Sequence, residues 1–308
     1  MRTKYTVLLI SLLLPLLGHG QQTPHYTMHI LNNYMINPAV TGATKCWEAN
    51  AGYRMQWVGF DAAPVTMFAN VHGRLNKKNS RKKTFEGLGA YFVKDATGPM
   101  SKIGGHVSYA FHIPVNRHLT TSIGISAGVQ QFKVDAGSLR PYDPVDPAVS
   151  SASSLLPDAN FGIWMYSEDF FTGLAARQLF PLTLSGTKIR ILNHFYYTIG
   201  YRLLVNNNVS IIPSAHARIG LITPPQIDAT LRVDWSNKFW IGVAYRKIEG
   251  IAGLLGLNLG PRLRLGYAYD YTLSKIGGYS SGSHEIILGY RPPCSRRGGG
   301  GKICPAYM

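Results

Sequence analysis

Apolar and polar residues alternate along most of the chain beyond residue 46. Between Arg262 and Tyr271, leucine and tyrosine occupy every second position, while arginine, glycine, alanine and aspartate fill the positions between them. The same rhythm recurs over residues 119–131, 195–203 and 226–235. Because successive side chains of a strand point to opposite faces of its sheet, this period of two predicts β-strands.

Fourteen such segments can be counted, and many have the length of about 9–11 residues that a tilted strand needs to cross a bilayer. A soluble β-sandwich would also alternate. However, the polar faces here are rich in glycine, serine and paired charges, which is typical of a barrel lumen. We therefore expect an all-β fold, a transmembrane antiparallel β-barrel of about 14 strands, with both chain termini in the periplasm. The expected strand starts are Trp47, Pro64, Glu86, Ser101, His118, Asp158, Phe170, His194, Val209, Gln226, Lys238, Gly250, Arg262 and His284.

The connections between these segments fall into two groups. Those after even-numbered strands are mostly short and would be periplasmic turns: 115–117, 167–169, 206–208, 236–237 and 260–261, with 76–84 as the longer exception. Three of those after odd-numbered strands are longer and would face outward: 132–157, 179–193 and 272–283. Such asymmetry is typical of outer-membrane barrels.

The first twenty residues have the pattern of a secretory signal peptide. Arg2 and Lys4 precede a mostly apolar run, and Gly18 and Gly20 supply small residues for cleavage, so that Gln21 would begin the mature chain. The run is shorter than the roughly 20 residues of a spanning helix. The expected organisation is a signal peptide (1–20), a periplasmic or plug segment (21–46), the barrel (47–290) and a periplasmic tail (291–308). The segment 21–46 lacks strand alternation, and it would fold inside the barrel, bind a periplasmic partner or form a flexible lead-in.

The chain is basic, with 31 Lys and Arg against 15 Asp and Glu. An exported protein rarely meets nucleic acid, so we expect anionic lipid headgroups of the outer membrane or an acidic protein as partners. Charges on the polar faces of the late strands would line the lumen, either as a lattice of ion pairs or as a receptor for a peptide. These are Arg202, Arg218, Arg232, Arg262, Arg264, Asp228, Asp234 and Asp270. A second basic group would lie on the periplasmic face: Lys77, Lys78, Arg81, Lys82 and Lys83.

Two patterns resemble catalytic or metal sites but lack the necessary context. Residues 124–128 match a nucleophile elbow, yet Ser126 lies inside an alternating strand rather than on a strand-to-helix turn. His25 and His29 are spaced for one helix face, but no third metal ligand is evident. We therefore predict no catalytic residue, no metal site and no cofactor.

Two stretches, YMINPAVTG at 34–42 and YRMQWVGFDAAP at 53–64, resemble the N-terminal signature of the PorP/SprF family of type IX secretion and gliding-motility membrane proteins. The order of segments and the Cys304–Pro305 pair are also similar to that family, whereas Val40 departs from its common aromatic residue. The resemblance implies a barrel that works with periplasmic and surface proteins of the apparatus and, in some members, holds exported adhesins at the cell surface. The motif residues that could contact partners are Asn37, Pro38, Gly42, Gln56, Trp57, Gly59, Phe60 and Pro64.

Three cysteines, Cys46, Cys294 and Cys304, leave open which pair forms a disulfide. Cys46 and Cys294 would meet where the first and last strands close the barrel, whereas Cys294 and Cys304 would close a glycine-rich loop in the tail. The sequence slightly favours the tail loop. For the function, two alternatives to a component of the secretion apparatus remain: a barrel enzyme with Ser and His near a rim, and a diffusion porin.

Overall fold

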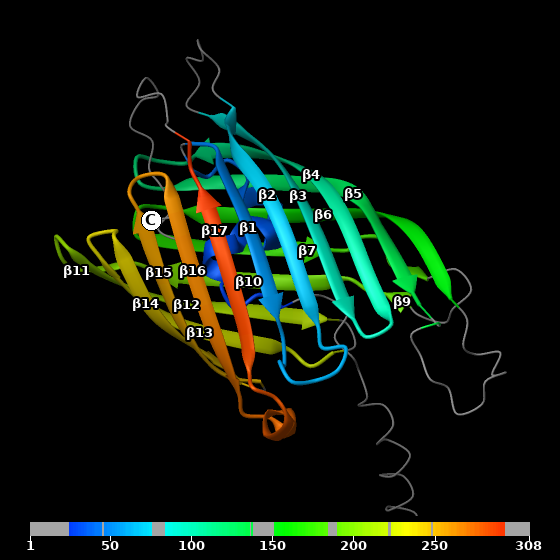
Figure 1. Ribbon diagram of the computed structural model, residues 1–308. Coiled ribbons are helices and arrows are strands. Elements are labelled where there is room, and N and C mark those ends of the chain that lie inside the picture. Colours follow the sequence, from blue (N-terminus) through cyan, green and yellow to red (C-terminus); the bar gives the residue numbers. More distant parts are fainter. Residues whose placement is uncertain are drawn as a thin grey trace, which may run out of the picture.

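The computed structural model describes residues 25–44, 46–75, 84–135, 137, 151–183, 190–220, 223–247 and 249–292. Within these ranges, no helix is both long and apolar enough to cross a membrane. Antiparallel strands dominate the fold (Figure 1). The strands of the main sheet are β1 (Glu48–Met55), β2 (Val65–Leu75), β3 (Phe85–Thr97), β4 (Met100–Pro114), β5 (Thr120–Val134), β6 (Ala152–Tyr166), β7 (Phe170–Arg177), β10 (His194–Tyr201), β11 (Leu203–Asn206), β12 (Val209–Gly220), β13 (Gln226–Trp235), β14 (Phe239–Arg246), β15 (Gly250–Leu259), β16 (Leu263–Thr272) and β17 (Ser283–Tyr290).

The sheet closes on itself. Each strand pairs with its neighbour along the chain, β10 pairs with both β7 and β12, and β1 pairs with β17 from Ala49↔Tyr290 to Met55↔His284. Because β10 and β11 are one strand interrupted at Arg202, the barrel has 14 strands, as the alternation predicted. Closure leaves no long unpaired edge between the first and last strands.

The strand starts agree with the predicted ones to within two residues at every position except one. β6 begins at Ala152 rather than at Asp158, because it pairs with β5 from Val134↔Ala152 onward. Pro157 lies inside this strand. Proline cannot donate a hydrogen bond to a neighbouring strand and is unusual inside a sheet. The sequence therefore predicted that residues 152–157 belong to the preceding loop.

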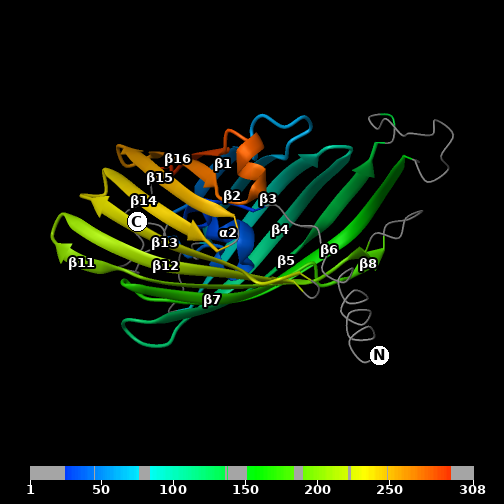
Figure 2. The ribbon, with the colours of Figure 1, turned by 90° about the horizontal axis from the view of Figure 1, so that it is seen from below.

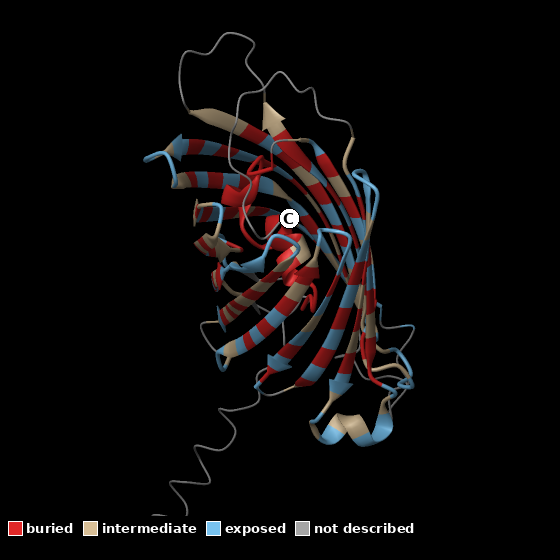
Figure 3. Ribbon diagram, turned by 90° about the vertical axis from the view of Figure 1, so that its left-hand side faces the viewer, coloured by how far each residue is buried: buried red, intermediate tan, exposed pale blue. Residues whose placement is uncertain are grey.

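Burial follows the alternation around the barrel (Figure 3). On β13, the outward side chains of Ile227 and Leu231 are 49% and 45% exposed, whereas the inward side chains of Asp228 and Arg232 are 2% and 3% exposed. The apolar outer surface suits lipid, and the inward charges avoid the penalty of about 2–4 kcal/mol that a basic side chain meets at the lipid-facing midplane.

The two ends of the barrel differ in their connections. β1 begins and β17 ends at the same end, where tight turns also lie, such as the β13–β14 turn, in which Ser236 and Asn237 have the positive φ angles of a type I′ hairpin. The opposite end carries the connections 56–64, 135–151, 178–193, 221–225 and 273–282, together with the short turns 98–99 and 247–249, whereas 76–84 is the one long connection at the first end. A small hairpin of β8 (Leu182–Thr183) and β9 (Arg190–Ile191) and the 3-10 helix η5 (Lys275–Tyr279) belong to this end. We therefore call it the outer end, and the other the periplasmic end.

A plugged lumen as the candidate functional site

Residues 25–44, which we call the plug, lie inside the barrel (Figures 1 and 2). All of these residues are buried except Leu31, which is half-buried and packs on the core. The plug consists of single turns: η2 (His29–Asn32), α2 (Asn33–Ile36) and η3 (Pro38–Val40). Pro38 begins η3, where its lack of an N–H costs nothing, and the Asn37 side chain accepts a hydrogen bond from the Ala39 N–H. The sequence left three placements open for this segment: inside the barrel, bound to a periplasmic partner, or a flexible lead-in. In the structure, residues 25–44 lie in the lumen.

The outer end of the plug is held by a buried cluster of charges at Thr27. The Thr27 N–H donates to Glu285 on β17 at 2.7 Å, and its hydroxyl donates to Asp270 on β16 at 2.8 Å. Arg54 on β1 joins these groups, with contacts of 2.6 Å to Asp270 and 3.1 Å to Glu285. Because Arg54 bridges β1 to both β16 and β17, this cluster also reinforces the seam at which the barrel closes.

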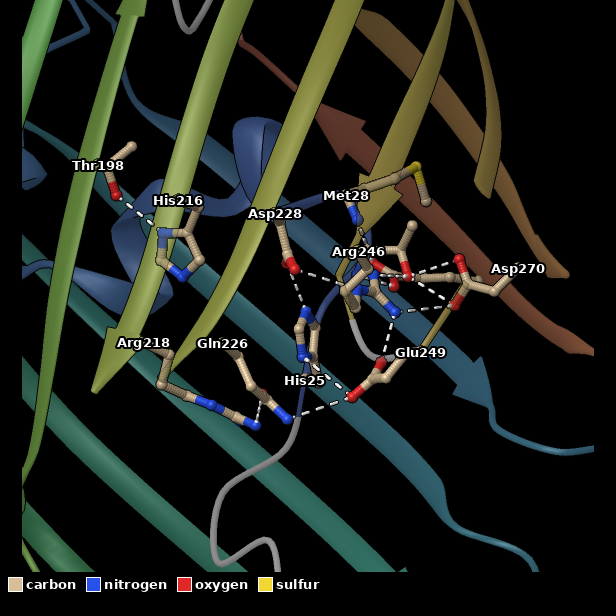
Figure 4. Close-up of polar contacts among 12 residues, drawn as sticks. His25, Met28, Thr198, His216, Arg218, Gln226, Asp228, Arg246, Glu249 and Asp270 are labelled. Atoms are coloured by element: carbon tan, nitrogen blue, oxygen red, sulfur yellow. Dashed lines mark hydrogen bonds and ion pairs between the residues drawn. The ribbon is translucent and has the colours of Figure 1, made fainter. Parts of the chain in front are cut away.

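His25 lies beside a second set of charges on β13, on β14 and in the turn that follows β14 (Figure 4). Its Nε2 is 2.7 Å from Asp228 Oδ2, and Arg246 contacts Asp228 at 3.3 Å and Glu249 at 2.8 Å. The contact with Asp228 is a hydrogen bond in which the Nε2–H donates to the carboxylate.

His29 stacks on His216 of β12, with ring centroids 4.8 Å apart. The His29 side chain is buried, and His29 is only 1% exposed. A cavity beside it is lined by residues of both plug and wall, including Arg177 and Tyr196. Within the residues that the structure describes, no three His, Cys, Asp or Glu side chains are grouped to bind a metal ion.

The middle and periplasmic parts of the plug meet glycines of the wall. A side chain at Gly162 would overlap the Asn37 amide, and one at Gly124 would overlap the backbone of Pro38 and Ala39. The Asn37 Nδ2 donates to the carbonyl oxygens of Ile163 and Leu174, each at 3.1 Å, and so binds β6 and β7 together. Here the absent Cβ permits close backbone approach.

The same principle applies nearer the periplasmic end. A side chain at Gly87 would overlap the Thr41 carbonyl, and one at Gly42 would lie 2.6 Å from the Gly87 Cα. Gly42 also has φ +78°, a conformation that favours glycine. The His112 Nε2 lies 2.8 Å from the Thr41 carbonyl oxygen and donates to it. The segment from Asn37 to Gly42, which is the second part of the first family motif, is therefore a packing element of the lumen.

The second family motif lies at the outer end, in the connection between β1 and β2. The Val58 N–H donates to the Gly282 carbonyl at 2.8 Å, and the Ser281 N–H donates to Val58 at 2.7 Å, so this loop is joined to the β16–β17 connection. Trp57 and Gly59 have positive φ angles of 53° and 108°. Phe60 is 41% exposed, Gln56 is buried, and Pro64 accepts the Gln56 N–H. These contacts place the motif residues in the hairpin connection between β1 and β2 at the outer end.

The predicted lumen charges are only partly right. Arg218, Arg232, Asp228, Asp234 and Asp270 are buried inside the barrel. Arg264 is partly buried and contacts Glu48.

The other two predicted lumen charges, Arg262 and Arg202, are less buried. Arg262 was assigned wrongly, because β16 begins only at Leu263 and Arg262 is exposed in the preceding turn. Arg202 interrupts β10 and β11 and is half-buried, with its N–H donating to the Asp169 carbonyl. Sequence reasoning missed Arg54, Arg246 and Glu285, although their alternation with apolar neighbours was a usable signal.

Ser126 has no arrangement typical of a nucleophile. It is 3% exposed and accepts a hydrogen bond from the Asn160 Nδ2 at 2.9 Å. The Gly-x-Ser-x-Gly pattern has another explanation here. Gly124 makes room for the plug, and a side chain at Gly128 would overlap the Gly105 carbonyl and crowd the His106 ring.

Two of the sequence predictions involve parts of the chain outside the described residues. Lys77, Lys78, Arg81, Lys82 and Lys83 all lie there, as do Cys294 and Cys304. Cys46 is disulfide-bonded. Because the chain has only three cysteines, a bond at Cys46 disagrees with the slight preference for a Cys294–Cys304 loop.

Comparison with known proteins agrees with this architecture. Residues 18–290 match the family of the type IX secretion system membrane protein PorP/SprF. The chain belongs to this family. Fold and family together place it in the outer membrane, as a membrane protein of the type IX secretion system.

Solved structures similar to this PorP/SprF member are outer-membrane barrels. The Ralstonia pickettii toluene transporter TbuX is 11% identical, with a TM-score of 0.53, over 85% of this chain and 93% of that chain. A deletion mutant of the monoaromatic hydrocarbon channel TodX is 9% identical, with a TM-score of 0.50, over 84% and 94% of the two chains. At such identities the likeness shows the fold alone. No curated protein matches this chain.

Proposed function

We propose that this PorP/SprF protein is a closed docking component of the type IX apparatus, which binds periplasmic and surface proteins at its rims and is neither a diffusion channel nor an enzyme. The observation that carries the proposal is the plug. The plug backbone packs against glycines of the barrel wall, and the outer end of the plug is hydrogen-bonded to buried carboxylates. Because the plug occupies the lumen, partner proteins would bind the barrel at its rims.

Conductance in planar bilayers tests the closed state. The intact protein should insert with little steady conductance, and a variant lacking residues 25–44 should conduct if its barrel still assembles. Heat-modifiable migration on semi-native gels shows that assembly independently. Conductance of the intact protein equal to that of the deletion variant would support the diffusion-porin alternative and overturn the proposal.

The docking role predicts capture of partners from native membranes. Intact protein should recover components of the secretion apparatus together with exported proteins that are held at the surface. Changing Lys77, Lys78, Lys82 and Lys83 to Gln should weaken the capture of acidic periplasmic partners and leave barrel assembly unchanged. Capture that persists unchanged at moderate salt would show that these charges contact only solvent or lipid headgroups.

A further inference from the structure

The plug has a direction, which follows from the strand residues that hold it. At its first residues, the partners lie at the outer ends of their strands. Arg54 is next to last in β1, Arg246 is the last residue of β14, and Glu285 is two residues after the start of β17. Glu249, which faces His25, lies in the outer turn between β14 and β15.

The last plug residues meet the opposite ends of strands. Gly87 is two residues after the periplasmic start of β3, and His112 is two residues before the periplasmic end of β4. The Gly42 N–H donates to the Nδ1 of His72, which lies near the periplasmic end of β2. The chain therefore runs through the lumen from the outer end at His25 to the periplasmic end at Thr44.

We propose that the barrel is threaded by its own N-terminal segment, so that the plug opens to the cell exterior at its His25 end and to the periplasm at its Thr44 end. The two ends of the barrel domain then open to different compartments. The N-terminal side reaches the exterior, and the strand end at Tyr290 faces the periplasm. This revises the expectation from the sequence that both termini lie in the periplasm, and it is independent of which partners the rims bind.

Three features make the threaded state stable rather than incidental. The Thr27 N–H and hydroxyl are both bonded to carboxylates of the wall. Arg54 shares these carboxylates across the β1–β17 seam, so the closed barrel and the seated plug stabilise each other. The glycines beneath Pro38 and Thr41 then fix the position of the plug along the lumen.

Cysteine labelling in intact cells tests the proposal. Thr23→Cys reports the residues before the plug, Tyr279→Cys reports the outer end, and Asn237→Cys reports the periplasmic turn between β13 and β14. Tyr279 is 80% exposed, and Asn237 is also exposed. A membrane-impermeant maleimide is added before or after the outer membrane is permeabilised, and the unmodified protein gives the background of the native cysteines.

The expected result is that Thr23→Cys labels in intact cells to the same extent as Tyr279→Cys, whereas Asn237→Cys labels only after permeabilisation. Labelling of Thr23→Cys that requires permeabilisation would overturn the proposal. So would a Thr23→Cys that stays unlabelled under both conditions, or a Tyr279→Cys that labels only after permeabilisation, since the latter would reverse the orientation. Protease added to intact cells that carry a cleavage site inserted after Gln22 gives an independent readout and should cut there.

Discussion

The outer end of the plug is held by ionised side chains, whereas its periplasmic half is held by close backbone contact. Around Thr27, buried Arg54 and Arg246 compensate Asp228, Asp270 and Glu285. Around Pro38 and Thr41, the wall supplies glycines. An ion cluster fixes the position of the plug only while every buried charge keeps its partner, whereas steric fit fixes that position through shape alone. The two ends should therefore fail in different ways.

Arg54→Ala should have the largest effect. The substitution leaves Glu285 and Asp270 buried with less compensating charge. Removing one partner of a buried ion pair lowers the free energy of unfolding by about 3–5 kcal/mol. We expect a lower urea midpoint in lipid vesicles and a barrel that loses its heat-modifiable migration. Arg117→Ala, in an exposed periplasmic turn, is the matched control and should change stability by no more than about 0.5 kcal/mol. Equal stability of the two variants would mean that the charge cluster contributes nothing to the seam.

Gly124→Ala should act on the other half of the plug. The new methyl group would overlap the backbone of Pro38 and Ala39, and overpacking of this kind costs typically about 1–3 kcal/mol. Because the barrel wall can persist while the plug shifts, we expect higher conductance with heat-modifiable migration retained. Gly105→Ala is the control on the neighbouring strand, where a Cβ meets no atom within 4 Å. Identical conductance of both variants would show that the glycine fit does not hold the plug.

Asn37→Ala should have a smaller effect in the same region. It removes the two donated bonds to Ile163 and Leu174 and the cap of η3, at a cost of about 1–3 kcal/mol. Limited proteolysis of the purified protein should then cut within the plug more rapidly than in the unmodified protein. Unchanged cleavage would indicate that the glycines alone fix this segment.

The contrast between the two ends also explains what the sequence could predict. Strand positions followed from alternation, because that signal is local, and Asp228 and Asp270 could be placed on inward faces for the same reason. The partnership of Arg54 with Glu285 joins residues 231 apart in sequence, and it depends on the register with which β1 meets β17. No local pattern carries that information. Likewise, a glycine in a strand does not indicate which backbone will approach it.

Ser126→Ala should have the smallest effect, and it separates packing from chemistry. The Ser126 hydroxyl accepts a bond from the Asn160 amide and is also hydrogen-bonded to the Tyr91 hydroxyl, and the Asn160 amide donates to Tyr91 at 3.3 Å as well. Because Asn160 and Tyr91 can still bond each other, the loss should be about 1 kcal/mol. Ser126 is buried on the lumen face of the wall, and its hydroxyl contacts the Asn160 amide rather than a general base. Partner capture and conductance of the variant should therefore match those of the unmodified protein. Both are measured on membranes containing equal amounts of barrel. Selective loss of a hydrolytic activity in this variant would instead revive the enzyme hypothesis, since a change in stability of this size cannot produce it.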